Sequence, residues 1–182
     1  MIVNSHNDWD PLEEIIVGHA HHSRIATDIS ARSFSYANFL KEDVVKLEGT
    51  YPQWVIDEAN EDADGLAKAL EDLGVIVHRP KIIDWDKKNY DIGQGWNTKG
   101  WYSWCPRDLI LPLGDMLIET PTPVRARYFE TRLYEDIMYE AFEDGALWMS
   151  APKPKLHDDM YTFEDIENKP TLLNHEICFD AP

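Results

Sequence analysis

The chain has 182 residues, and its 34 Asp and Glu against 17 Lys and Arg give a formal net charge of −17. This acidity excludes binding to nucleic acids and to anionic membranes, because phosphate groups and anionic lipids repel such a surface. The content of 43% hydrophobic and 12% aromatic residues excludes intrinsic disorder and predicts one globular domain over residues 1–182.

The N-terminal part of the chain predicts a strand, a helix and a second strand. Residues 12–18 form an apolar, β-branched run that ends at a glycine, which is typical of a short buried strand. A helix is expected to begin at Pro52 and to end at Gly74, and a strand at 75–77 follows it. Its apolar stripe, with spacings of three and four, consists of Ile56, Ala59, Ala63, Leu66, Leu70 and Leu73.

A second unit begins with a predicted β-hairpin. Strands at 109–113 and 116–118 are separated by Gly114 and Asp115, a pair typical of a tight two-residue turn. Pro112 cannot donate a hydrogen bond within a sheet, so the first of these strands is expected at an edge or a bulge.

A helix over 129–144 and a strand over 146–149 complete the second unit. The helix is expected to bury one face made of Leu133, Ile137, Met138, Ala141 and Phe142. A loop over 150–160 follows, and the apolar segment 177–179 is the start of a third unit. Alternating strands and helices indicate an α/β protein.

Two side-chain clusters are open to more than one interpretation. His19, His21 and His22 resemble a metal site, but no Cys or carboxylate has ligand spacing nearby, so a polar loop is favoured. Aromatic residues alternate with glycines over 90–104, and they would line a ligand pocket or anchor a long loop to the core.

The two cysteines, Cys105 and Cys178, cannot form a disulfide framework, which indicates a reducing compartment. The N-terminal residues lack the pattern of a signal or transit peptide, and no apolar run reaches the roughly 20 residues that span a bilayer. We therefore expect a cytoplasmic protein. Neither thiol has a general base nearby in sequence, so both are interpreted as small buried apolar residues.

Two carboxylates are better candidates for a site. Asp108 follows the rigid Cys105-Pro106-Arg107 segment, and Asp180 ends the apolar segment 177–179. Carboxylates at strand ends of α/β folds often face a site, where they pair with a cationic group.

Five segments together resemble the amidinotransferases, the family of the arginine:glycine and inosamine-phosphate amidinotransferases. Residues 7–18 (NDWDPLEEIIVG) resemble the opening of that family. The later matches occur in the same order as in the family, at 106–108 with 114–119 (PRD and GDMLIE), 125–130 (RARYFE), 151–154 (APKP) and 176–181 (EICFDA).

The resemblance implies a pentein fold, a propeller of five ββαβ modules, of which this chain would supply about two and a half. It implies amidino transfer from arginine to an amine acceptor such as glycine, through a covalent amidino-cysteine and without a cofactor or metal. Asp108 matches a guanidinium-binding aspartate, and Asp180 matches the aspartate that partners the catalytic histidine. Arg107 lies beside Asp108 and is expected to orient it.

The family's catalytic histidine, a further aspartate and the nucleophilic cysteine belong to a C-terminal half that has no match here. Neither Cys178 nor His175 takes their place, since both lie within or before the Asp180 motif. We therefore expect a chain that is inactive alone and pairs with a C-terminal-half polypeptide or with itself. The alternatives are a non-catalytic module that binds a guanidino ligand or a homologue, and a pentein hydrolase.

Overall fold

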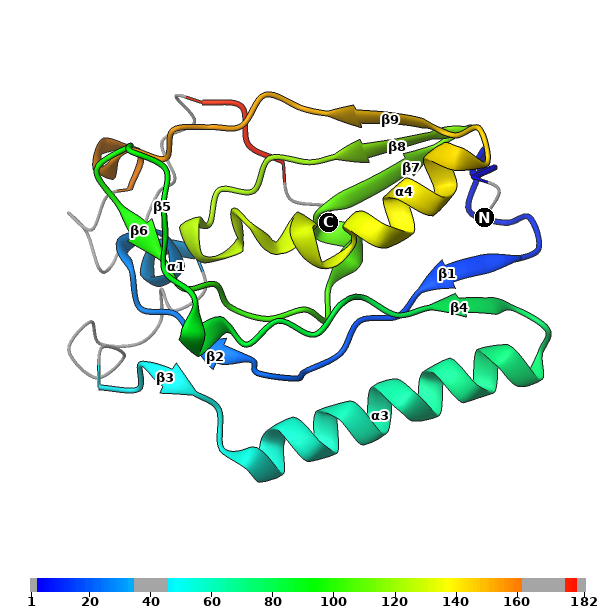
Figure 1. Ribbon diagram of the computed structural model, residues 1–182, viewed down its shortest axis with the longest axis horizontal. Coiled ribbons are helices and arrows are strands. Elements are labelled where there is room, and N and C mark those ends of the chain that lie inside the picture. The colour runs from blue at the N-terminus through cyan, green and yellow to red at the C-terminus, as the bar shows by residue number, and fades with distance from the viewer. Residues whose placement is uncertain (1–2, 35–45, 162–175, 180–182) are drawn as a thin grey trace.

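A computed structural model describes residues 3–34, 46–161 and 176–179 (Figure 1). Three α-helices are described: α1 (Ile29–Phe34), α3 (Gln53–Asp72) and α4 (Glu135–Glu143). The strands are β1 (Glu14–Ile16), β2 (Arg24–Ile25), β3 (Gly49–Thr50), β4 (Ile76–His78), β5 (Tyr90–Asp91), β6 (Asn97–Thr98), β7 (Ile110–Leu113), β8 (Met116–Glu119) and β9 (Leu147–Ser150). None of the described helices is long and apolar enough to cross a membrane.

The first predicted unit is confirmed. β1 pairs with β4 in parallel, and α3 connects them along the outside of the molecule (Figure 1). Gly74 lies directly after the helix with a φ of +89°, a left-handed conformation that glycine adopts without the steric cost of a side chain.

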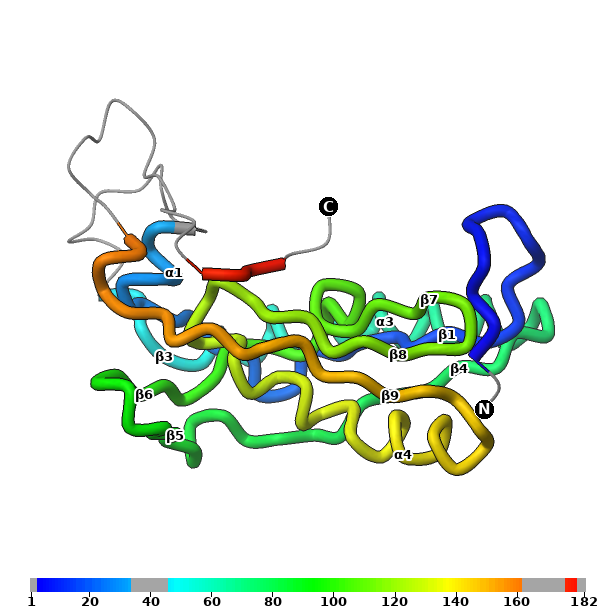
Figure 2. Tube along the Cα trace, turned by 90° about the horizontal axis from the view of Figure 1, so that it is seen from above, coloured from blue at the N-terminus to red at the C-terminus, as the bar shows by residue number. Residues whose placement is uncertain are grey.

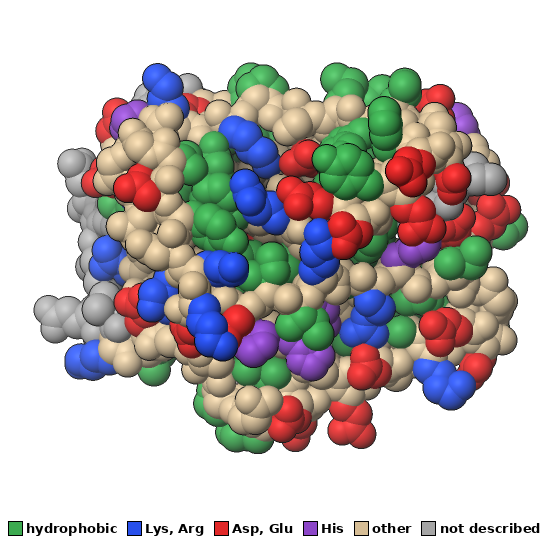
Figure 3. All heavy atoms as spheres, viewed as in Figure 1, with side chains coloured by type: hydrophobic (Ala, Val, Ile, Leu, Met, Phe, Trp, Pro, Cys, Tyr) green, Lys and Arg blue, Asp and Glu red, His purple; other side chains and the backbone are tan. Residues whose placement is uncertain are grey.

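The buried face of α3 agrees in part with the predicted stripe. Ile56 is buried and Ala59, Ala63 and Leu70 are half-buried, whereas Leu66 and Leu73 are exposed. Asn60 is also buried, and its side-chain oxygen accepts a hydrogen bond of 2.8 Å from the backbone N–H of Ala20. Hydropathy does not detect this polar anchor on the buried face of the helix. In the right half of Figure 3, acidic side chains gather over α3 and α4.

The second unit has the predicted ββαβ order. β7 and β8 form an antiparallel hairpin around Gly114, whose φ is +61°. β9 adds to β8 in parallel, so β7 and Pro112 lie at an edge of the three-stranded sheet, as expected.

The predicted helix over 129–144 is wrong in its first half. A 3-10 turn (Glu130–Leu133) precedes α4, and the two are separated at Tyr134, which has a φ of −104° and a ψ of 0° and caps both. The Tyr134 hydroxyl donates a hydrogen bond of 3.1 Å to the Ser103 carbonyl, and its ring is fully buried. The expected face is buried except for Phe142, which is exposed.

One hydrophobic core joins the two units. It contains Leu117 of β8, Ile137, Met138 and Ala141 of α4, and Trp85, with Ile16 of β1 packed against it. α4 therefore packs both on its own sheet and on the first unit. These described elements confirm an α/β fold with two similar units; the fivefold propeller stays a prediction.

The segment 177–179, which was expected to start a third unit, forms no strand. Residues 177–179 lie in an extended segment, where the Phe179 N–H donates a hydrogen bond of 2.6 Å to the Pro121 carbonyl. Ile177 and Phe179 are both exposed, so this apolar segment lies on the surface beside the chain that follows β8.

Gly18, which follows β1, lies in close contact with the backbone of residues 103–104, and a substitution can test this contact. A Cβ atom at this position would lie 2.4 Å from Trp104 Cα and 2.5 Å from the Ser103 carbonyl oxygen, which are backbone atoms that cannot rotate away. We expect Gly18→Ala to lower the free energy of unfolding by about 2–3 kcal/mol, measured by urea denaturation.

The matched control is Gly65→Ala on the exposed side of α3, where a Cβ meets no atom within 4 Å. That change should raise the free energy of unfolding by about 0.5–1 kcal/mol, since alanine favours a helix over glycine. Equal effects of the two substitutions would contradict the close approach at Gly18.

Candidate active site around Asp108

Asp108 lies at the end of a 3-10 turn (Pro106–Asp108), immediately before β7. Its backbone carbonyl accepts a hydrogen bond of 2.7 Å from the Thr120 hydroxyl, and the Thr120 N–H donates to the Leu109 carbonyl at 2.9 Å. The turn is thereby tied to the end of the hairpin. The Asp108 side chain is 17% exposed, so it is held in place but is still accessible to solvent.

Arg127 holds the Asp108 carboxylate. Its guanidinium is only 3% exposed, and Nη1 donates to Asp108 Oδ2 at 2.7 Å. Nε donates to Glu130 Oε2 at 2.8 Å, and Nη2 donates to the Cys105 carbonyl at 3.3 Å. A buried cation therefore has two carboxylate partners and one carbonyl partner.

Glu130 is the deepest member of this group, with a side chain that is 1% exposed. Its second oxygen, Oε1, accepts a hydrogen bond of 3.2 Å from the Tyr102 N–H. The Tyr102 ring lies 4.9 Å from the Arg127 guanidinium carbon, within the range of a cation–π contact. We call Tyr102, Cys105, Asp108, Arg127 and Glu130 the Asp108 cluster.

Burial sets the charge states within the cluster. It raises the pKa of Glu130 to about 7, although the Arg127 cation opposes that shift. Burial alone would lower the pKa of Arg127, but the attraction of Glu130 outweighs it, so the pKa of Arg127 is raised and the guanidinium stays charged. Burial also raises the pKa of the Tyr102 phenol, which therefore stays neutral at physiological pH.

The cluster leaves one carboxylate oxygen available. Asp108 Oδ2 is occupied by Arg127, and Oδ1 has no hydrogen-bond partner among the described residues. A carboxylate in this state can accept hydrogen bonds from a second cationic group without moving. The arrangement is suited to binding a guanidinium or an ammonium group.

The expectation for Arg107 is wrong, because its side chain is exposed and the cation that holds Asp108 is Arg127. Asp180 lies outside the described residues. Arg127 and Glu130 belong to the RARYFE motif, but neither was predicted as a site residue; their spacing of three residues is the one signal in the sequence that they could pair.

The three histidines have different polar partners. His19 is buried, its Nε2 donates to the Lys81 carbonyl at 3.1 Å, and its ring centroid lies 5.1 Å from that of His21. His22 Nδ1 lies 3.9 Å from an Asp84 oxygen. Within residues 3–34, 46–161 and 176–179, no group of three His, Cys, Asp or Glu residues is placed to hold a metal ion.

Most aromatic rings of the 90–104 segment anchor the loop. Trp96 and Trp101 are buried in two small apolar clusters, and the Trp96 indole N–H donates to the Lys155 carbonyl at 2.8 Å. Tyr102 contacts the Asp108 cluster and stacks on Trp104 with a centroid distance of 4.9 Å. Of the two interpretations, the anchored loop fits most of these rings, and Tyr102 alone lies at the site.

Neither cysteine forms a disulfide within the described part of the chain, and both are partly buried. Burial raises the pKa of Cys178 to about 11, with a further contribution from Glu176, so this thiol is protonated at physiological pH. A protonated thiol is a poor nucleophile.

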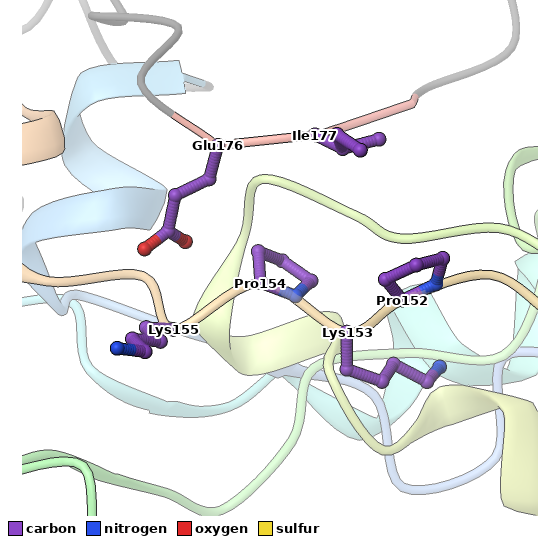
Figure 4. A pocket seen from close by; sticks show the side chains of 6 residues that line it. All are labelled: Pro152, Lys153, Pro154, Lys155, Glu176 and Ile177. Atoms are coloured by element: carbon purple, nitrogen blue, oxygen red, sulfur yellow. The ribbon is translucent and has the colours of Figure 1, made fainter.

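A shallow pocket of about 270 Å³ lies between the 152–155 segment and the C-terminal segment (Figure 4). Glu176 accepts a hydrogen bond of 2.8 Å from the Leu156 N–H, which fastens the two segments together. Burial lowers the pKa of Lys153, whose Nζ lies 3.6 Å from Glu119. The pocket is thus built on a link between two parts of the chain, and the Lys153 side chain points away from Glu176 and Ile177 (Figure 4).

Comparison with known proteins finds similarity to amidinotransferases. No family model matches the chain. It is 40% identical to inosamine-phosphate amidinotransferase 1 of Streptomyces griseus, over 99% of this chain and 51% of the relative. It is 34% identical to the mitochondrial glycine amidinotransferase of Xenopus laevis, over 98% of this chain and 45% of the relative.

Two solved structures are similar as well. An inosamine-phosphate amidinotransferase from Streptomyces griseus superposes with a TM-score of 0.79 at 39% identity, over 87% of this chain and 45% of that chain. An amidinotransferase of the saxitoxin pathway from Microseira wollei gives a TM-score of 0.76 at 35% identity, over 90% and 45%. The chain thus spans about half the length of the relatives it matches, which agrees with the expected match to one half of the family.

The Asp108 cluster leads to a stability prediction. Arg127→Met leaves the Glu130 carboxyl buried beside Asp108 without its cation, and we expect it to lower the free energy of unfolding by about 3–5 kcal/mol, measured by urea denaturation. Arg107→Met, one residue from Asp108 but exposed, is the matched control and should change it by less than about 0.5 kcal/mol.

Adding Glu130→Leu to Arg127→Met should restore part of the loss, because the double variant no longer buries an unpaired carboxyl. Equal effects of Arg127→Met and Arg107→Met would show that the buried ion pairs do not form.

His19 leads to a pH prediction. Burial lowers its pKa below 6.5, and Nδ1 has no hydrogen-bond partner among the described residues, so a second proton would be placed in an unsatisfied position. Near pH 6.5 the unfolded chain therefore binds more protons than the folded one. The free energy of unfolding should fall as pH drops below about 6.5.

In His19→Gln this part of the pH dependence should disappear, whereas in His157→Gln, where the side chain is exposed, it should remain. The free energy of unfolding of the unchanged chain and of both variants is measured by chemical denaturation from pH 5 to 8. An unchanged pH dependence in His19→Gln would contradict the assignment.

Proposed function

Because this chain is related to the amidinotransferases over nearly all of its own length, we propose that it forms the N-terminal half of such an enzyme. The complete enzyme would transfer the amidino group of arginine to an amine acceptor such as glycine. The printed names of the relatives support amidino transfer, and the choice of arginine and glycine is part of the proposal.

The observation that carries the proposal is the state of Asp108. One of its oxygens is held by the buried Arg127, and the described residues leave the other oxygen without a partner. A substrate guanidinium has parallel N–H groups that match a carboxylate, and charge-assisted hydrogen bonds of this kind are about twice as strong as neutral ones. Asp108 would therefore bind the guanidinium of arginine, and Asp180 would contribute a second carboxylate.

The proposed reaction has two steps. A cysteine thiolate attacks the guanidinium carbon of arginine, a carbon–sulfur bond forms, and the bond to the ornithine nitrogen breaks as that nitrogen takes a proton from a histidine. The acceptor amine then attacks the same carbon and loses a proton to the histidine, and the sulfur leaves as a thiolate. Asp180 would orient this histidine.

The cysteine and the histidine would come from a second half of the enzyme, on the same protein or on a separate polypeptide. Cys178 is not suited to the role, because burial holds the pKa of its thiol at about 11. A cytoplasmic location stays a prediction; the Xenopus laevis relative is named as mitochondrial.

The test combines this chain with the segment of the Streptomyces griseus inosamine-phosphate amidinotransferase 1 that it does not match. We expect the mixture to release ornithine from arginine in the presence of an amine acceptor. Asp108→Asn should lower kcat/KM by about 100-fold, since an amide cannot offer a charged acceptor to the guanidinium. Asp62→Asn, on the exposed face of α3, should leave it unchanged.

The alternatives have distinct outcomes. Arginine binding without ornithine release in the mixture would favour the non-catalytic module. Citrulline in place of an amidinated acceptor would favour a hydrolase. Ornithine release by this chain alone would contradict the need for a second half.

A further inference from the structure

Arg127 is shared between two carboxylates that lie at different depths. Its Nη1 donates to Asp108 at 2.7 Å, and its Nε donates to Glu130 at 2.8 Å. The Asp108 side chain is 17% exposed, whereas the Glu130 side chain is 1% exposed. A single guanidinium therefore connects a carboxylate at the surface to a carboxylate in the interior.

The two carboxylates come from different parts of the fold. Asp108 immediately precedes β7, whereas Glu130 begins the turn that leads into α4. Figure 2 shows α4 on one side of β7, β8 and β9, and the segment of residues 176–179 on the opposite side. Arg127 thus joins a group at the start of the sheet to a group at the approach to the helix that covers one side of this sheet.

Glu130 is held at both of its oxygens. Oε2 accepts from Arg127 Nε, and Oε1 accepts from the Tyr102 N–H at 3.2 Å. Because the side chain is enclosed, it cannot turn toward solvent when its charge changes. A change in the charge of Glu130 therefore acts on Arg127 and Asp108 as a change in electrostatic potential, at a low local dielectric constant.

The cluster has one negative charge in excess when both carboxylates are ionised, since the Arg127 cation balances only one of them. An unbalanced charge is costly where water is largely excluded. Two events remove it. A proton can bind to Glu130, or a cation can bind to the Asp108 oxygen that has no partner among the described residues. Each event lowers the gain from the other, so the two compete.

The ionisation of Glu130 falls in the range where this competition has an effect. Burial raises the pKa of Glu130 to about 7, the Arg127 cation opposes this shift, and the Asp108 carboxylate adds to it. Burial also raises the pKa of the two phenols beside Glu130, which therefore stay neutral near pH 7. In the described part of the chain, the titratable and charged groups around Glu130 are Arg127, Asp108, Tyr102 and Tyr134, with the Cys105 thiol near the same two phenols.

We propose that Glu130 is a positioning residue of the guanidinium site, which acts on Asp108 through Arg127 so that a bound guanidinium competes with a proton on Glu130. The inference rests on the proposed binding of a guanidinium at Asp108 and adds its coupling to a proton. An ionised Glu130 balances Arg127 and leaves the charge of Asp108 to the substrate. A protonated Glu130 leaves Asp108 as the only carboxylate that balances Arg127.

The sign of the pH dependence follows from this competition. Glu130 loses its proton as the pH rises through about 7, so the affinity for a guanidinium should rise over the same range and then become constant. A site made of an aspartate alone would bind equally well across this range, since an aspartate is normally ionised above about pH 5.

The test measures the binding of methylguanidinium to this chain by NMR between about pH 5.5 and 8.5. We expect Kd to fall by about 10-fold as the pH rises across this range. Glu130→Gln keeps the shape of the side chain but not its charge, so it should bind at every pH with about the affinity of the unchanged chain at low pH. If Glu130 had a merely structural role, Kd of the unchanged chain would not depend on pH.

Two control variants identify the titrating group. Glu61→Gln removes the same charge from the exposed side of α3 and should keep the pH dependence, which excludes the net charge of the chain as its cause. Cys105→Ser should also keep it, which excludes the thiol.

A second measurement needs no substitution. Because coupling is reciprocal, saturating methylguanidinium should lower the midpoint of the Glu130 carboxyl titration by about 1 pH unit, measured by ¹³C NMR of the carboxyl carbon. A midpoint that does not move with the ligand bound would contradict the coupling.

The outcomes separate this inference from the proposed function. Binding whose pH dependence is lost in Glu130→Gln, without ornithine release from the mixture of halves, supports the coupling and overturns the enzymatic proposal. Ornithine release together with a pH-independent Kd overturns the coupling alone. Absence of methylguanidinium binding at any pH, or a pH dependence that persists in Glu130→Gln, also overturns the inference.

Discussion

The site of this protein depends on one buried cation. A guanidinium that is almost fully removed from water is tolerated only when its N–H groups meet acceptors, and Arg127 meets Asp108, Glu130 and the Cys105 carbonyl. This requirement brings the 102–108 loop and the 125–130 segment to the same point. The carboxylate that faces solvent is thereby held in one orientation, which is the condition for binding a ligand without a cost in ordering.

The rest of the fold supports this arrangement through a core shared by the two units. α4 and its own sheet contribute to one buried cluster, Ile16 of the first unit packs against that cluster, and Lys81 pairs with Asp136 of α4, so the two units do not separate into domains. Tyr134 connects the helix to the site, because its hydroxyl is bonded to Ser103 in the loop that carries Tyr102 and Cys105. The break between the 3-10 turn and α4 is therefore part of the construction of the site.

Charge acts on this chain at two ranges. The net charge of −17 would favour the approach of the proposed cationic substrate over a broad surface, whereas Asp108 would act on it at contact distance.

The sequence by itself determined five of the described strands (β1, β4, β7, β8 and β9), the two main helices and the hairpin, because local periodicity and glycine or proline signals encode them within a few residues. It also pointed to Asp108 through the family motifs. Only the tertiary structure decided the burial of Asn60 on α3, the break at Tyr134 and the choice of Arg127, not Arg107, as the partner of Asp108. Each of these depends on a hydrogen bond or ion pair between residues distant in the chain, which no local pattern records.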